Sequence, residues 1–166
     1  MAKNSSFDIS TGVDLQEVDN AVNQARKEIG QRYDFKGTNC SITFDRAAGS
    51  VALDADDAYR LEALKTVLRE KLAKRGVPLK NLDEGKVEEG TLGRHRQTLG
   101  LKQGIDQETA KKISKDIRDS GMKKVQVQIQ KDELRVTAPA RDTLQDVIAF
   151  LRERDYGVAL TFGNYR

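Results

Sequence analysis

The sequence predicts an α+β fold, because one order of short elements occurs twice along the chain. In each copy an alternating segment comes first, and an amphipathic helix, two short strands and a second helix follow it. Apolar residues recur at helical spacing in the helices and alternate with polar residues in the strands. This β-α-β-β-α order is the split βαβ pattern of ferredoxin-like (RNP-like) domains, so we expect two such domains in tandem. Each should form a four-stranded antiparallel sheet backed by two helices on one face.

The elements of the first copy follow from periodicity and stop signals. They are an alternating segment around 7–9, a helix over 14–29, strands over 40–44 and 50–53, and a helix over 56–75. The first helix has one apolar stripe, made of Val18, Val22, Ala25 and Ile29. Asp14 is a suitable N-cap for it, and Gly30 is expected to end it. The second helix carries four leucines on one face and should stop at Gly76.

The second copy repeats this order. Its elements are an alternating segment around 97–102, a helix over 106–120, strands over 124–130 and 133–137, a helix over 141–154 and a last alternating segment over 158–162. Asp106 should cap the first of these helices, and Gly121 should close it. In the strand over 124–130, valines and an isoleucine alternate with glutamines, so one face should be core and the other polar. The stretch 77–90 lacks a period and is expected to be a connection, whereas 91–103 should be a long strand.

Composition narrows the class of protein. Of the 166 residues, 37% are hydrophobic and 33% are charged, which is typical of a soluble protein with a modest core. No apolar stretch approaches the roughly 20 residues that a membrane span needs. The N-terminus resembles no signal peptide, and a single cysteine suits a reducing compartment, so we expect a cytoplasmic protein. The net charge of +3 is compatible with an anionic ligand but is unlike that of a DNA-coating protein.

Residues that usually carry catalysis are scarce. His95, the one histidine, lies between two arginines and has no second ligand at metal-binding spacing. Cys40 falls on the apolar side of an expected strand, which favours a buried structural thiol over a nucleophile. Asp54, Asp56 and Asp57 could hold a cation, but helix capping explains Asp56 or Asp57 more simply. Phosphate loops and dinucleotide-binding glycine motifs are absent. We therefore expect no enzyme, no cofactor and no metal site.

The loop that follows the first helix is the strongest candidate for ligand binding. It contains Arg32, Tyr33, Phe35 and Lys36 within five residues. Such a set can stack on a base and pair with a phosphate. The alternative is that an aromatic side chain of this loop fills the edge of the core while the charges stay solvated.

Further candidates lie in the second half of the chain. Lys102 and Gln103 lead into a helix whose first N–H groups could receive an anion, although a strand-to-helix turn at Gly104 is the simpler explanation. Arg135 on an open sheet face and Arg141 at the start of the last helix could complete a basic patch, or each could be ordinary surface. Asp106 argues against an anion directly at its own helix terminus, because two negative charges would compete there.

The open sheet faces disfavour one form of nucleic-acid binding. An RNA-recognition motif presents aromatic residues on its open face, where bases stack on them. Here that face should carry glutamine, serine and threonine, while Phe44 and Phe162 fall on the core side of the alternation. Stacking of single strands on the sheets is therefore not expected.

Several short segments together match sequence motifs of a known protein family. In chain order they are Ser6-Phe7-Asp8-Ile9, Arg32-Tyr33-Asp34-Phe35-Lys36, Lys74-Arg75-Gly76, Leu101-Lys102-Gln103-Gly104-Ile105, Gln128-Ile129-Gln130 with Arg135-Val136-Thr137, Arg141-Asp142 with Leu144-Gln145, and Phe162-Gly163-Asn164-Tyr165-Arg166. Over nearly its whole length the chain thus resembles the YajQ family. Single segments are not specific, but their order is.

The resemblance implies a bacterial, cytoplasmic, nucleotide-binding protein built from two duplicated ferredoxin-like domains that exchange their N-terminal strands. The exchange would place Ser5–Ser10 in the second sheet and Thr91–Gln103 in the first. The first domain would then be 11–103, and the second would be 1–10 plus 104–166. Relatives are linked to cyclic di-GMP, transcription control, RNA or nucleoside triphosphates.

The chain differs from the usual sequence of this family at three places, all in loops and not in the core. Lys131 stands where glycine is common in a tight turn, Ala138-Pro139-Ala140 replaces a more polar lead into the last helix, and 91–98 has less aromatic character. They put the identity of the ligand in question and leave the fold untouched.

The function expected from these observations is non-catalytic binding of a nucleotide, cyclic di-GMP among the candidates, or of RNA. The binding residues would be Arg32, Tyr33, Phe35, Lys36, Lys102, Gln103, Arg135 and Arg141. The main alternative is a regulatory adaptor with a protein partner. A metal-assisted nucleotide-processing enzyme, with Asp54, Asp56 or Asp57 as ligands, is a weaker alternative.

Overall fold

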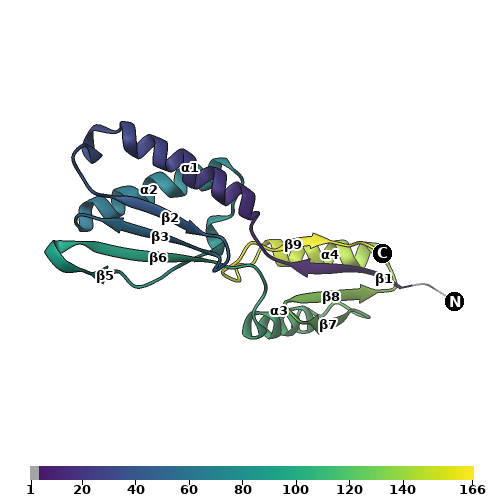
Figure 1. Cartoon of the computed structure of the whole chain (residues 1–166). Coiled ribbons are helices and arrows are strands. Elements are labelled where there is room, and N and C mark those ends of the chain that lie inside the picture. Colours follow the sequence, from purple (N-terminus) through teal and green to yellow (C-terminus); the bar gives the residue numbers. More distant parts are fainter. Residues whose placement is uncertain (1–3) are drawn as a thin grey trace. The chain divides into compact units, whose positions relative to one another are not determined.

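A computed structural model describes residues 4–166, which form two compact units (Figure 1). The central unit comprises Val13–Lys102. The terminal unit combines the segment that ends at Gly12 with Gln103–Arg166. No helix within residues 4–166 is long and apolar enough to cross a membrane.

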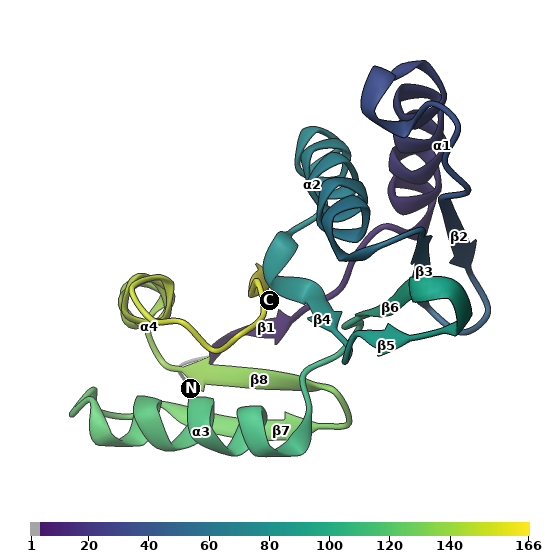
Figure 2. The same ribbon diagram turned by 90° about the vertical axis from the view of Figure 1, so that its left-hand side faces the viewer.

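The central unit packs two helices, α1 (Leu15–Gln31) and α2 (Ala58–Lys74), on one face of an antiparallel sheet (Figure 2). Its strands are β2 (Ser41–Asp45), β3 (Ser50–Ala55), β4 (Leu82–Glu84), β5 (Glu88–Glu89) and β6 (His95–Leu101), in the order β2-β3-β6-β4, with β5 also paired to β6. Short 3₁₀ turns lie at Tyr33–Phe35, Leu79–Asn81 and Thr91–Gly93. Every strand pair in this sheet is antiparallel.

Alternation along the strands explains the core of this unit. Val51 lies opposite Leu99 in the pairing of β3 with β6, and both side chains are fully buried. The leucines of α2 that share one helix face are 0–1% exposed and cover these positions. Burying one such side chain contributes roughly 1.5–3 kcal/mol, so this contact between helix and sheet holds the unit together.

The terminal unit has the same plan. Its sheet order is β7 (Gln126–Gln130), β8 (Glu133–Ala138), β1 (Ser5–Ser10) and β9 (Thr161–Gly163), and its helices are α3 (Gln107–Asp119) and α4 (Arg141–Arg152). Strand β1 pairs with β8 on one side and with β9 on the other. Phe7 and Ile9 of β1 are fully buried against both helices.

The predicted exchange of strands is confirmed. Phe7 pairs with Val136 in the terminal unit, and Leu99 of β6 pairs with Val51 in the central unit. Each exchanged strand is followed along the chain by a helix of the other unit, α1 after β1 and α3 after β6. Each sheet therefore contains a strand from outside its own repeat.

The helix caps agree with the sequence in most cases. The carboxylates of Asp14, Asp57 and Asp106 accept hydrogen bonds from the backbone N–H groups of Gln16, Arg60 and Thr109, at 2.7–2.9 Å. The expected end of α1 at Gly30 is wrong, since the helix continues to Gln31 and the N–H of Arg32 still reaches the carbonyl of Glu28 at 2.9 Å. The two other expected glycine stops have the left-handed conformation that ends a helix, with φ of 78° at Gly76 and 80° at Gly121.

The expectation of two four-stranded sheets is also wrong in part, because the central unit has a five-stranded sheet. The stretch expected as a connection contains β4 and β5. Only Leu82 of these two strands is buried, so no alternation marks them in the sequence. The long strand expected over 91–103 is shorter, because Thr91–Gly93 form a turn in which Leu92 has φ of 58°.

One predicted core face is less covered than expected. Strand β7 lies at the edge of its sheet, where Val127 is half-buried and Ile129 is 36% exposed. The glutamines on its other face, Gln126, Gln128 and Gln130, are exposed as predicted.

Candidate functional site

A cavity of about 830 Å³ lies in the central unit between the last turn of α1, the turn at Tyr33–Phe35 and the edge strand β2. We call it the α1–β2 pocket. Its lining comprises Arg26, Ile29, Gly30, Gln31, Arg32, Tyr33, Phe35, Lys36, Gly37, Thr38, Cys40, Ser41, Ile42 and Thr43. All four members of the predicted loop set lie here, three cations are included, and none of these residues carries a carboxylate.

The turn that forms one wall is anchored by an aromatic side chain. Phe35 is 5% exposed and belongs to the core of the central unit, whereas Tyr33 is 89% exposed. The Thr38 hydroxyl donates a hydrogen bond to the Phe35 carbonyl at 2.6 Å, and Gly37 has φ of 77°, which turns the chain toward β2. The two aromatic residues thus divide the roles that the sequence left open: Phe35 fixes the turn, and Tyr33 presents its ring to solvent.

Arg32 is held in place by acidic neighbours. Its guanidinium donates two hydrogen bonds to the carboxylate of Asp34, at 2.8 and 3.0 Å, and also lies 3.5 Å from Glu28. It sits over the ring of Phe35, 5.5 Å from the centroid. The hydrogen bonds to Asp34 raise the pKa of Arg32 and lower the pKa of Asp34. Arg32 therefore contributes a fixed shape and little net charge to the pocket.

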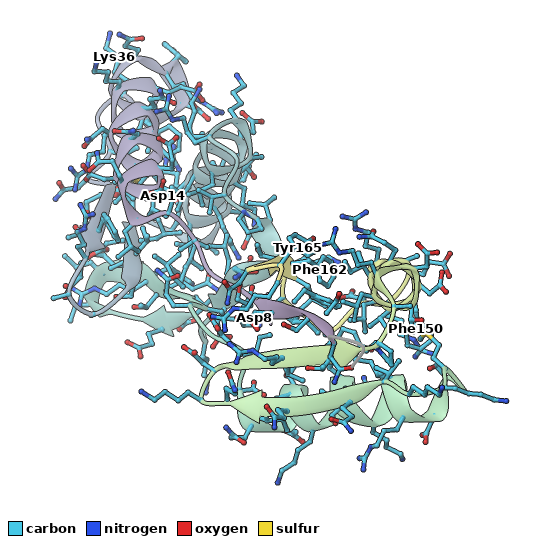
Figure 3. All side chains as sticks on the ribbon, turned by 90° about the vertical axis from the view of Figure 1, so that its right-hand side faces the viewer. Asp8, Asp14, Lys36, Phe150, Phe162 and Tyr165 are labelled. Carbon is cyan, nitrogen blue, oxygen red and sulfur yellow. The ribbon has the colours of Figure 1, made fainter. Side chains whose placement is uncertain are left out.

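Arg26 and Lys36 supply the charge that is not compensated. The Arg26 Nε donates a hydrogen bond to the carbonyl of Ile42 on the outer edge of β2, at 2.8 Å. Within residues 4–166 its two terminal nitrogens have no partner, nor has the ammonium of Lys36. Lys36 lies at the far end of the helical layer, where its side chain extends into solvent (Figure 3). Two free cations thus border a pocket that has hydroxyl groups on Thr38, Ser41 and Thr43.

The structure does not bring Lys102 and Gln103 to this pocket. Ser41, at the pocket, is in the row of Asp54 and Arg96, whereas Lys102 follows the opposite end of β6, where Gly100 pairs with Ser50. The backbone N–H and carbonyl of Lys102 both bond to buried Asn81, at 2.8 Å each. Gln103 lies in the terminal unit, beside Gly12.

Arg135 and Arg141 lie in the terminal unit, and each has different surroundings. The Arg135 Nε donates a hydrogen bond to the carboxylate of Asp8 at 3.0 Å, and the Asn164 amide donates another at 2.6 Å. The bond from Arg135, with help from Asn164, lowers the pKa of Asp8. Arg141 begins α4 and lines a separate cavity.

The three aspartates considered as cation ligands have other partners. Asp57 caps α2, and Asp56 accepts a hydrogen bond from the N–H of Asn39 at 2.8 Å. Asp54 pairs with Arg94 at 2.7 Å and with Arg96 at 3.1 Å. Among residues 4–166 no group of three or more His, Cys, Asp or Glu residues could hold a metal ion.

Two single residues considered for catalysis are placed as follows. A ring nitrogen of His95, Nδ1, lies 2.8 Å from the carbonyl of Gly93, within the turn before β6. The prediction of a buried Cys40 is wrong: it precedes β2, is half-buried, and has its Sγ 3.8 Å from Asp56. Cys40 is one of the residues that line the α1–β2 pocket.

Sequence reasoning missed Arg26. It lies on the exposed side of α1, six residues before Arg32, and at that spacing no helix face is shared with the loop. Arg26 reaches the pocket because its side chain bonds to the carbonyl of Ile42 at the edge of β2. An exposed arginine that precedes an aromatic, basic loop is too common a pattern to have been selected from sequence.

The chain is similar to known proteins over its full length. A family model described as "Nucleotide-binding protein YajQ-like" matches residues 5–166. A protein from Bacillus cereus strain B4264 that is named a nucleotide-binding protein is 50% identical over 166 residues, which is 100% of both chains. A nucleotide-binding protein of Bacillus anthracis strain CDC 684 is 49% identical over the same length, again 100% of both chains.

Proposed function

The chain belongs to the YajQ-like family of nucleotide-binding proteins, and on that premise we propose that it binds a nucleotide, free or within RNA, in the α1–β2 pocket without converting it. One observation carries the choice of site. The pocket is lined by three cations and no carboxylate side chain, and within residues 4–166 the two terminal nitrogens of Arg26 and the ammonium of Lys36 have no partner.

The proposed roles follow from the geometry. Arg26 is fixed through Nε and leaves its terminal nitrogens for phosphate oxygens, which guanidinium groups bind in bidentate fashion. Lys36 adds a second, mobile positive charge. The exposed ring of Tyr33 offers a face for a base, and Arg32 stiffens the turn beneath it.

The size of each contribution sets the expected affinity loss. A hydrogen bond to a charged group contributes about 1.5–3 kcal/mol, so the loss of Arg26 or Lys36 should weaken binding roughly 10- to 150-fold. Loss of the Tyr33 ring should cost about 1–3 kcal/mol if a base stacks there.

Support for binding without turnover comes from the carboxylates. Asp34 and Glu28 are bonded to Arg32, and Glu28 also pairs with Lys71 at 2.9 Å. Asp56, 3.8 Å from the Sγ of Cys40, accepts a hydrogen bond from the N–H of Asn39. The ion pairs lower the pKa of Asp34 and of Glu28, which makes each carboxylate a weaker general base.

The single cysteine provides a direct test of the site. Because Cys40 lines the pocket and is half-buried, bound ligand should slow its alkylation by iodoacetamide in the full-length protein. Titrations should use ATP, GTP, cyclic di-GMP and a short RNA, each at two salt concentrations. Binding of RNA through phosphates should weaken steeply as salt rises, and binding of a small nucleotide less so.

Variants locate the effect. Arg26→Ala and Lys36→Ala should abolish the protection of Cys40 at ligand concentrations that protect the parent protein. Lys27→Ala is the matched control, because Lys27 is an exposed cation on α1 that does not line the pocket. The choice of site is wrong if a ligand binds by calorimetry while both pocket variants keep the parent affinity.

A second candidate function is a protein-interaction adaptor. Leu92 is 98% exposed at the turn before β6, with φ of 58°, and an apolar residue so displayed is suited to contact with a partner protein. If none of the four ligands binds more tightly than about millimolar, which corresponds to about 4 kcal/mol, the adaptor function is favoured over nucleotide binding.

A further inference from the structure

A second cavity, of about 300 Å³, lies in the terminal unit between the first turns of α4 and the extended segment at 165–166. We call it the α4 pocket. It is lined by Ser5, Ser6, Arg141, Leu144, Gln145, Tyr165 and Arg166. Among these described residues are two arginines, one aromatic ring, one amide and no carboxylate side chain.

Both guanidinium groups are available to a ligand. The side chains of Arg141 and Arg166 are exposed, and neither has a hydrogen-bond or ion-pair partner within residues 4–166. The carboxylate of Asp8, which interacts with Arg166, is already bonded to Arg135 at 3.0 Å and to Asn164 at 2.6 Å. Two guanidiniums that have no hydrogen-bond or ion-pair partner within residues 4–166 thus lie at one cavity, and arginine binds phosphate in bidentate fashion.

The segment that carries Tyr165 and Arg166 is held in place. The N–H and carbonyl of Arg166 both pair with the backbone of Ser6, at 3.0 and 3.1 Å. The ring of Tyr165 packs against buried Phe7, with centroids 6.3 Å apart, and its hydroxyl reaches the carbonyl of Phe162 at 3.4 Å. Figure 3 shows Tyr165 next to Phe162 at the end of the chain's last strand. The ring is therefore pre-positioned, and it is still 59% exposed.

We infer that the α4 pocket binds one nucleoside monophosphate unit. Arg141 and Arg166 would hold the phosphate, Tyr165 would stack on the base, and the Gln145 amide and the hydroxyl groups of Ser5 and Ser6 would bond to polar atoms of the ligand. The volume is at the lower limit of small-molecule sites, which suits a single nucleotide unit. The unit can be a free nucleotide or part of an RNA strand, since both offer the same phosphate and base.

The absence of tryptophan from the sequence makes the site measurable in the whole chain. Tyr165→Trp places the protein's single tryptophan in the α4 pocket, and Tyr33→Trp does the same in the α1–β2 pocket. Both positions are well exposed, so the larger ring can be accommodated. Each reporter is titrated with AMP, adenosine, inorganic phosphate and a short oligoadenylate.

The expected result is a saturable change of Tyr165→Trp fluorescence with AMP or oligoadenylate, and at least tenfold weaker binding of adenosine. In that background Arg141→Ala and Arg166→Ala should each weaken binding at least tenfold. Arg118→Ala is the matched control, since Arg118 is exposed on α3 and does not line the pocket. A response to oligoadenylate alone, steeply dependent on salt, identifies the source of the nucleotide as RNA.

Calorimetry with Arg26→Ala/Lys36→Ala protein separates this site from the α1–β2 pocket. Binding that survives in this variant and disappears on further change of Arg141→Ala supports the α4 pocket whether or not the first proposal holds. The inference is overturned if AMP and oligoadenylate give neither heat nor fluorescence change, if adenosine binds as tightly as AMP, or if Arg141→Ala and Arg166→Ala both leave affinity unchanged.

Discussion

Replacement of Phe7 by alanine should destabilise the terminal unit and leave the central unit folded. Phe7 precedes the central unit in the sequence, yet its side chain is fully buried in the terminal unit. There its ring lies 5.9 Å from that of Phe162 and 6.3 Å from that of Tyr165, and its strand partner is Val136. The substitution therefore tests the strand exchange through its energetic effect.

The magnitude follows from the burial. A Phe→Ala change at a fully buried site costs about 3–5 kcal/mol. At about 0.05–0.15 kcal/mol per residue, a unit of roughly 75 residues has a stability of about 4–11 kcal/mol. The substitution should thus remove between about a quarter and all of the stability of the terminal unit. Global opening of that unit should become roughly 100- to 5,000-fold more frequent, because each 1.4 kcal/mol is a factor of ten.

Hydrogen exchange followed by mass spectrometry of proteolytic fragments measures the effect by region. In Phe7→Ala protein, peptides from β8 and α4 should exchange faster, and those from β2 and α2 should keep their parent rates. Leu99→Ala is the reciprocal variant, because Leu99 is fully buried in the central unit although it belongs to the second repeat. It should cost about 2–5 kcal/mol and accelerate exchange in β2 and α2 instead.

The two patterns must be opposite for the reasoning to hold. If Phe7→Ala accelerates exchange in the central unit alone, Phe7 packs within its own repeat and the exchange of strands does not exist. If both variants accelerate both units equally, the units open together and the assignment of each strand to one unit has no energetic meaning.

Further predictions concern substitutions at four single positions. Arg135 holds the pKa of Asp8 below its ordinary value of 3.8. The stabilisation from this carboxylate is therefore fully present above pH 3.8 and is lost as the pH falls through the lower pKa of the folded state. Asp8→Asn should lower the free energy of unfolding measured in urea at pH 7, and it should make the loss of stability below about pH 4 less steep. A Cβ at Gly104 would lie 2.6 Å from the Cβ of Asp132, so Gly104→Ala should lower the free energy of unfolding by about 1–3 kcal/mol. Gly30 lies within a helix and a Cβ there would meet no atom within 4 Å, so Gly30→Ala should raise the free energy of unfolding by about 0.5–1 kcal/mol. Lys131 has a φ of 55° in the turn between β7 and β8. Lys131→Gly should raise the melting temperature, because relief of this left-handed conformation contributes about 1 kcal/mol. An unchanged melting temperature would mean that the turn carries no strain.

Elements with a strong local signal could be read from the sequence. The caps at Asp14 and Asp106 and the buried stripes of the helices appear where periodicity places them. Strands β4 and β5 were missed because a strand at or near a sheet edge with one buried residue has no alternation to detect. The expected helix end at Gly30 was wrong because a glycine ends a helix where its φ is positive, and the sequence does not show the φ of a residue.

The candidate site shows the same division. The loop around Tyr33 and Phe35 could be selected because aromatic and basic residues crowd within a few positions. The contribution of Arg26 depends on a hydrogen bond to the edge of β2, sixteen residues away, which no local pattern encodes. Lys102 was grouped with the loop by its charge, and the strand register places it at the opposite end of the sheet.

The exchange of strands has a consequence for synthesis on the ribosome. β1 is translated before its partners β8 and β9, and the whole central unit lies between β1 and β8 in the sequence. At about 5–20 residues per second, Phe7 and Ile9 wait roughly 6–25 seconds for the strand that covers them, while the central unit, one contiguous segment, is already complete. During that interval the nascent chain displays an unpaired apolar strand, the kind of segment that associates with other chains. Conditions that slow translation of the second half should therefore raise the demand of this protein for chaperones that shield nascent chains.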